Sequence, residues 1–70
     1  MRVLGIDPGS ETLGWGVVEG TGSRYSAVGH GTVRSNRRDA FAKRLSNIFA
    51  GVDEVIGRYK PDVLSIEDAF

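Results

Sequence analysis

The stretch FAKRLSNIFAGVDEVIGRY, residues 41–59, carries an apolar residue at every third or fourth position, with charged residues between them. This spacing is typical of an amphipathic α-helix. Ser35, Asn36 and Asp39 are candidate caps for its start, and Pro61 prevents continuation much past Tyr59. The apolar positions are Phe41, Leu45, Ile48, Phe49, Val52, Val55, Ile56 and Tyr59.

Three segments before this helix have the composition of β-strands. Residues Arg2–Asp7 form a nearly continuous apolar run that ends in the turn sequence Asp-Pro-Gly-Ser. Residues Thr12–Glu19 and Arg24–Arg34 are rich in β-formers, and the glycine-rich residues 20–23 separate them. Short connections between consecutive strands predict an antiparallel meander.

A fourth strand, Asp62–Glu67, follows the helix with the sequence DVLSIE. A helix between two strands makes a crossover, which favours placing this strand parallel to the strand Arg2–Asp7 with the helix packed on the sheet. Both segments resemble interior strands with two covered faces, and one helix covers only one face. The sequence therefore predicts an α/β sheet whose second face is covered by further polypeptide or by a partner.

Composition narrows the class of protein. The chain has 70 residues, no cysteine, and nine acidic and nine basic side chains. Disulfides and thiolate metal sites are therefore excluded, and the neutral charge gives no support for nucleic-acid binding. No signal peptide or apolar run of membrane-spanning length is present, so we expect one small, soluble, cytoplasmic domain.

Two acids, Asp7 and Glu67, fall at the carboxyl ends of the two apolar strands. Because side chains alternate along a strand, parallel pairing in the matching register would place the two carboxylates side by side at one edge of the sheet. A divalent cation relieves the repulsion between such neighbours, and carboxylate oxygens suit Mg²⁺. A pair of Mg²⁺ ions can activate a water and stabilise the leaving oxygen of a phosphodiester. An isolated Asp-Pro-Gly-Ser is more often a simple turn, so the metal site depends on both acids together.

Three stretches resemble the N-terminal part of the RuvC family of crossover junction endodeoxyribonucleases, hydrolases that cut four-way Holliday junctions in DNA recombination and repair. They are LGIDPGSETLGWGVVE at residues 4–19, FAKRLSNIFAGVDEVIGRYKPD at 41–62 and SIEDAF at 65–70. The resemblance implies a ribonuclease-H-like fold, with Asp7 and Glu67 as catalytic carboxylates that bind two Mg²⁺ ions, for which Mn²⁺ is a possible substitute. It also implies that Phe70 contacts DNA bases.

The resemblance further implies partners and a boundary. Expected partners are four-way junction DNA, a second copy of the chain in a homodimer, and the RuvA and RuvB branch-migration complex, all in the bacterial cytoplasm. Family members continue past the position of Phe70 with a dimer helix and a further pair of aspartates. We therefore expect residues 1–70 to be the incomplete N-terminal part of a single nuclease domain, inactive by itself.

Several other side chains that could serve a binding site have simpler structural explanations. Trp15 is expected to be a core residue, His30 a structural histidine with no companion ligand, and Asp68 a solvated acid on the face opposite Glu67. A cluster of basic side chains surrounds the start of the helix. Such clusters are usually solvated, yet the residues of this one are the local candidates for phosphate contacts, with Arg37 and Arg38 the first of them. The cluster consists of Arg34, Arg37, Arg38, Lys43 and Arg44.

Three alternatives remain at this stage. An ATP-binding domain of the actin, sugar-kinase and chaperone group has a similar first hairpin, but that group needs a much longer chain and leaves Glu67 unexplained. A related nuclease acting on RNA or other nucleic acid shares the opening LGIDPG but lacks the SIEDAF match. The third is a truncated, non-catalytic module that keeps the fold.

Overall fold

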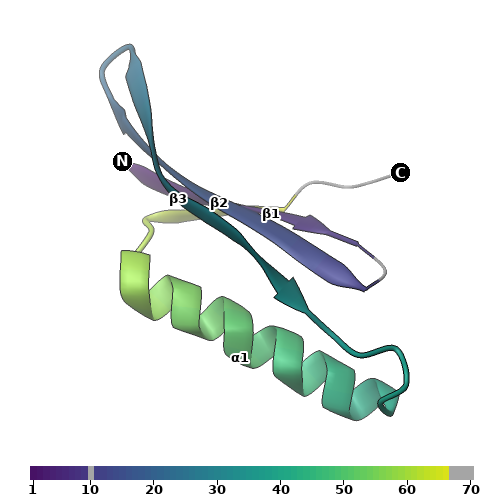
Figure 1. Cartoon of the computed structure of the whole chain (residues 1–70). Helices are drawn as coiled ribbons and strands as arrows, with labels where there is room; N and C mark the ends of the chain where they lie inside the picture. The colour runs from purple at the N-terminus through teal and green to yellow at the C-terminus, as the bar shows by residue number, and fades with distance from the viewer. Residues whose placement is uncertain (10, 67–70) are drawn as a thin grey trace.

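The computed structural model describes residues 1–9 and 11–66. Within these residues, four strands form one sheet in the order β3-β2-β1-β4, and one helix lies along one face of it (Figure 1). The elements are β1 (Arg2–Pro8), β2 (Thr12–Thr21), β3 (Arg24–Arg34), α1 (Phe41–Tyr59) and β4 (Val63–Ile66). The predicted meander, crossover helix and fourth strand are confirmed.

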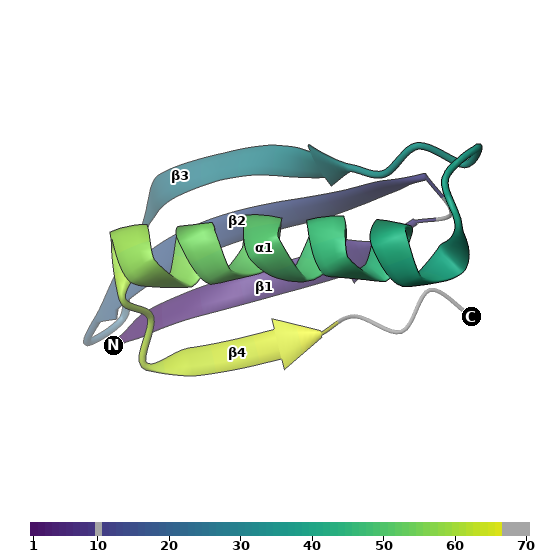
Figure 2. The same ribbon diagram turned by 90° about the horizontal axis from the view of Figure 1, so that it is seen from below.

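The sheet is mixed, with β1 in its interior. β1 pairs antiparallel with β2, and β2 pairs antiparallel with β3, with an irregularity between Val17 and Val18. On its other side β1 pairs in parallel with β4, from Val3↔Val63 to Ile6↔Ile66. Figure 2 shows β1 between β2 and β4, with α1 running across the sheet. The parallel pairing is the one that the crossover predicted.

The core lies between the sheet and α1. Alternation along the strands directs Leu4 and Ile6 of β1 and Leu13 and Val17 of β2 toward the helix, where Val55 meets them. Leu4 is fully buried, and burying a leucine side chain stabilises a fold by roughly 1.5–3 kcal/mol.

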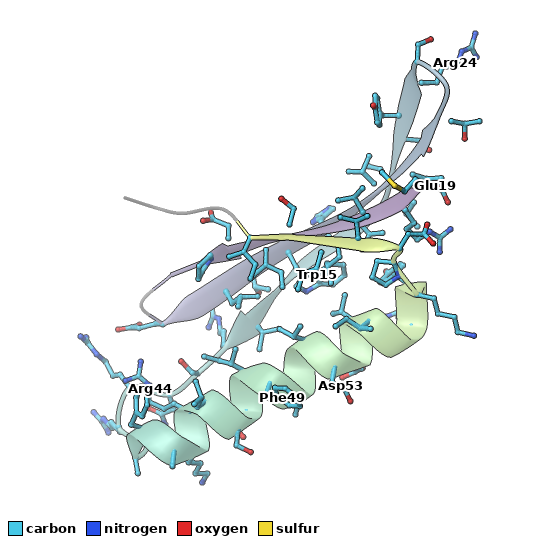
Figure 3. All side chains as sticks on the ribbon, turned by 180° about the vertical axis from the view of Figure 1, so that it is seen from behind. Trp15, Glu19, Arg24, Arg44, Phe49 and Asp53 are labelled. Carbon is cyan, nitrogen blue, oxygen red and sulfur yellow. The ribbon has the colours of Figure 1, made fainter. Side chains whose placement is uncertain are left out.

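Trp15 belongs to this layer, as the sequence predicted. It is partly buried against the core, and Figure 3 shows it between the sheet and α1. Its ring centroid lies 5.5 Å from that of Tyr59, with the ring planes inclined by 50°. Tilted aromatic pairs at this separation contribute about 0.5–1.5 kcal/mol beyond their buried area.

β4 differs from the prediction of a buried interior strand. It lies at the edge of the sheet, and Val63, Leu64 and Ile66 are 41%, 49% and 64% exposed. Within the described part of the chain, β4 has only β1 beside it, and α1 leaves Leu64 and Ile66 uncovered. The other face of the sheet carries no helix or strand among the described residues.

The predicted caps at the start of α1 are wrong. The N-cap is Ala40, which makes no side-chain capping hydrogen bond. Ser35 is buried, and its hydroxyl donates to the Glu11 carbonyl oxygen at 3.3 Å. The Asn36 side-chain oxygen accepts from the Arg38 amide at 3.0 Å. These polar side chains thus stabilise the loop before the helix. Serine and asparagine are as well suited to such loop hydrogen bonds as they are to capping a helix.

The predicted end of α1 is confirmed. Lys60 has a left-handed backbone with φ of 49°, and its amide donates to the Ile56 carbonyl oxygen at 2.8 Å. Pro61 follows, and a proline disfavours the right-handed helical conformation in the residue before it.

Candidate metal and nucleic-acid site

Asp7 is exposed near the carboxyl end of β1, on the face of the sheet opposite α1. This face is known from alternation, because the neighbouring Ile6 packs in the core on the helix side. Asp7 pairs with Gly14, where an added Cβ would lie 4.0 Å from the Asp7 Cβ. The carboxylate therefore stands on the open face with no side chain opposite it on β2.

A hollow of about 500 Å³ extends from Asp7 across this face. Its floor includes the small residues Gly5, Gly14, Gly16 and Ser65, which sequence reasoning did not single out as lining a site. The signal was the Gly-Trp-Gly alternation, which puts the large ring in the core and two glycines on the opposite face. The lining residues are Val3, Gly5, Ile6, Asp7, Gly14, Trp15, Gly16, Val18 and Ser65.

The second predicted carboxylate, Glu67, lies outside the described residues, as do Asp68 and Phe70. The described part of the pairing ends at Ile6↔Ile66, with Gly5 opposite Ser65 on the open face. This is the register on which the predicted pair of acids depends.

That register is set at the other end of β1, by residues the sequence reasoning did not single out. The Arg2 amide donates to the Asp62 carboxylate at 2.8 Å, and the Asp62 amide donates to the Arg2 carbonyl oxygen at 2.8 Å. The Arg2 guanidinium donates to the Tyr59 carbonyl oxygen at 2.8 Å. Arg2 thereby binds both the last residue of α1 and the residue before β4, which aligns β4 with β1.

The basic cluster lies at the same end of the molecule as Asp7. β3 runs in the direction of β1, because both are antiparallel to β2, so the carboxyl ends of β1 and β3 lie at one end and α1 begins there. The Arg37 guanidinium is 3.0 Å from the Glu11 carboxylate, and its side chain is 76% exposed. Arg38 is exposed as well. The structure thus brings Asp7 and the predicted DNA-contacting arginines to one end.

The donor chemistry near Asp7 fits a hard cation only in part. A carboxylate oxygen suits Mg²⁺. Residues 1–9 and 11–66 contain no group of three or more acidic, histidine or cysteine side chains able to hold a metal ion. His30 is exposed, opposite Gly16, and belongs to no such group.

Comparison with known proteins gives the family. A family model described as "Crossover junction endodeoxyribonuclease RuvC" matches residues 3–70. The chain belongs to the RuvC family. The crossover junction endodeoxyribonucleases RuvC of Geobacter metallireducens and Geobacter sulfurreducens are 46% and 43% identical to it over 70 residues. The chain spans about 43% of the length of each of these curated relatives.

Solved RuvC structures have the same fold. The Thermus thermophilus RuvC structure matches with a TM-score of 0.82 and 36% identity, over 99% of this chain and 46% of that one. The same organism's RuvC in complex with Holliday junction substrate matches with a TM-score of 0.87 and 33% identity, over 97% of this chain and 42% of that one. The four-stranded mixed sheet with its crossover helix is therefore the ribonuclease-H-like fold of RuvC.

In the described part of the chain, no helix is both long and apolar enough to cross a membrane.

Proposed function

We propose that the protein containing these residues is a Holliday junction resolvase, a metal-dependent endonuclease that hydrolyses phosphodiester bonds in four-way DNA junctions during recombination and repair in the bacterial cytoplasm. The observation that carries the proposal is the position of Asp7 in a RuvC-family chain. It is exposed at the carboxyl end of β1, beside a glycine-floored hollow, next to a parallel β4. The Thermus thermophilus relative whose fold this chain shares was solved with a Holliday junction substrate.

In this proposal Asp7 and Glu67 hold Mg²⁺, with two ions in a complete site and Mn²⁺ as a possible substitute. Two such metal ions would supply an activated water and stabilise the charge that develops on the leaving oxygen. Asp7 acts from a rigid interior strand, which keeps its carboxylate in place. The side-chain-free surface at Gly14 and Gly16 leaves room for the sugar-phosphate backbone beside it.

The proposal includes contacts outside the two acids. Phe70 stacks on a base near the exchange point, since aromatic rings stack on unpaired bases of any sequence. Arg37 and Arg38 contact phosphates, and their exposure at the Asp7 end of the molecule supports that role.

Activity belongs, in this proposal, to a homodimer of the whole gene product working with RuvA and RuvB. Residues 1–70 are the N-terminal part of one nuclease domain and do not cleave DNA alone. Two carboxylates are a thin ligand set for two cations, which supports this view. The purified 70-residue chain should leave a labelled four-way junction intact in Mg²⁺; measurable cleavage by it would refute this part of the proposal.

The test of function compares the whole gene product on a synthetic four-way junction and on a linear duplex of the same sequence, with and without Mg²⁺. Paired nicks in the junction alone, and only with the metal, are expected. Tight Mg²⁺-ATP binding without nicking would instead support the actin-like alternative, and equal cleavage of RNA substrates would support a different nuclease. The RuvC family match favours the junction nuclease over both.

A further inference from the structure

Positive charge is concentrated in one segment of a chain whose formal net charge is zero. Residues 34–44 hold five of the nine lysines and arginines and one of the nine acids. This segment joins the end of β3 to the first turn of α1, at the end of the molecule where Asp7 lies. Clustered positive charge attracts a polyanion such as DNA. Sheet geometry then identifies which of these side chains faces the site.

Arg34 is on the same face of the sheet as Asp7. Asp7 pairs with Gly14, Gly14 pairs with Thr32, and Arg34, two residues after Thr32, pairs with Thr12. Paired residues in antiparallel strands point to the same face, so Asp7, Thr32 and Arg34 all lie on the face opposite α1. Two strand spacings and one two-residue step separate Asp7 from Arg34, which is roughly 12 Å between their Cα atoms.

The sheet surface between Asp7 and Arg34 carries few large side chains. In the row that contains Asp7, only Gly14 separates it from Thr32. Gly14 and Gly16 lie in the floor of the hollow that begins at Asp7. A nucleic-acid strand could therefore pass from Asp7 toward β3 with no large side chain of β2 in its way.

Arg34 is held in place while its charge stays available. It is exposed, and within residues 1–9 and 11–66 it forms no ion pair, whereas Arg37 lies 3.0 Å from Glu11 and Lys43 lies 3.9 Å from Asp39. The next residue, Ser35, is buried, and its amide donates to the Glu11 carbonyl oxygen at 2.9 Å. The backbone at Arg34 is thus fixed before any ligand arrives, which lowers the entropy lost on binding.

We propose that Arg34 is a positioning residue of the nuclease: its guanidinium contacts a phosphate of the DNA strand a few nucleotides from the bond cleaved beside Asp7. This inference rests on the proposed function. The contact fixes where the strand lies on the sheet and reads no base, because phosphate contacts set register and orientation only. Its loss raises KM and leaves kcat close to that of the wild type.

The test measures binding of the whole gene product to a synthetic four-way junction, in EDTA, between 50 and 200 mM NaCl. Removing one phosphate contact lowers the slope of log K against log salt by about 1. For Arg34→Ala, we therefore expect the fourfold increase in salt to weaken binding about 3.5-fold less than it does for the wild type. Arg34→Lys keeps the charge and should keep the slope.

The matched control is Arg24→Ala. Arg24 is an exposed arginine on the same strand, but it lies at the tip of the β2–β3 hairpin, far from the end of α1 where Arg44 lies (Figure 3). Its slope should equal that of the wild type. Arg34→Gln, which keeps most of the side-chain stem, replaces Arg34→Ala if thermal unfolding shows that the alanine variant is not folded.

The outcomes separate this inference from the function on which it rests. A wild-type slope for folded Arg34→Ala or Arg34→Gln, with junction cleavage by the wild type intact, overturns the role of Arg34 alone. An equal loss of slope in Arg24→Ala also overturns it, because the effect would then be one of net charge. A wild-type protein that neither binds nor cuts junctions removes both proposals.

Discussion

Gly31 of β3 lies directly opposite Trp15 of β2, and the indole ring covers the place where a side chain at Gly31 would begin. A Cβ at this position would stand 2.8 Å from the Trp15 Cζ2 atom. The ring cannot easily move away, because Tyr59 packs against it from α1. Gly31 is therefore required for the packing between sheet and helix.

Gly31→Ala should destabilise the protein by about 1–3 kcal/mol, the usual result of adding a methyl group to a filled core. The midpoint of urea unfolding, followed by tryptophan fluorescence, measures this. An unchanged midpoint would mean that the indole ring has room to shift.

Gly57→Ala is the control for Gly31→Ala, and its expected effect on the stability of the fold is the opposite. Gly57 lies inside α1 with nothing within 4 Å of an added Cβ. Alanine there should stabilise the protein by about 0.4–1 kcal/mol, because it reduces the freedom of the unfolded chain and favours the helix. A lower midpoint for Gly57→Ala would show that this side of α1 is covered in the whole protein.

Asp7→Asn and Glu67→Gln should each reduce junction cleavage more than about 100-fold, because even residues that only support a metal ligand change activity by about 10–100-fold. Junction binding in EDTA should stay near the wild-type level, since no metal is bound in that assay. Single-turnover cleavage and gel-shift titration measure the two quantities.

Asp53→Asn is the matched control for the acids. Asp53 is exposed on α1 and points away from the sheet (Figure 3). Its cleavage rate should match that of the wild type. If Asp7→Asn cuts at a similar rate, Asp7 is not a metal ligand.

Asp62→Ala should loosen the alignment of β4 with β1. It removes the acceptor of the Arg2 amide, a hydrogen bond worth about 0.5–1.5 kcal/mol. Amide hydrogen exchange at Leu64 and Ile66 should accelerate, and half-maximal cleavage should need more Mg²⁺. Asp62→Asn keeps an acceptor oxygen and should show smaller effects; equal behaviour of the two variants would argue against this role.

Glu19 should make the protein more sensitive to acid. The terminal ammonium of Met1, which hydrogen-bonds the carboxylate, and then Arg2 lower the pKa of Glu19 below its usual 4.5. A carboxylate with a lowered pKa in the folded state stabilises the protein above the unfolded-state pKa, and this contribution is lost as pH falls through the folded-state value. As pH is lowered below 4.5, Tm should therefore fall less for Glu19→Gln than for the wild type. Parallel curves would contradict this.

The elements were predictable because their patterns are local. The strands near Arg2–Asp7 and Thr12–Glu19 and the helix from Phe41 to Tyr59 follow from periodicity, and the crossover rule then gave the parallel pairing. The role of two glycines could not be predicted: Gly31 and Gly51 weaken a strand or helix in isolation, but in the structure they lie against Trp15 and Val33. Their value depends on residues distant in sequence, which no local pattern reveals.

The site was predicted in part for the same reason. Alternation put Gly5 and Asp7 on one face of β1, and the register Gly5↔Ser65 is the predicted one. The prediction that β4 is a buried interior strand was wrong, because an apolar run shows which side chains a strand can bury and does not show which element covers them. The caps at Ser35 and Asn36 were wrong because their side chains have nearer partners in the loop.

The hydrogen bonds of Arg2 with Tyr59 and Asp62 lie at the opposite end of β1 from Asp7. The pairing of β1 with β4 is continuous from Val3↔Val63 to Ile6↔Ile66, so a shift of β4 at Asp62 would move each of these β4 residues relative to β1. The chemistry proposed for one end of the sheet therefore depends on hydrogen bonds at the other end. Harmful substitutions in this family need not lie near the proposed metal site: a change at Asp62 that shifts β4 would reduce cleavage although Asp7 and Glu67 remained intact.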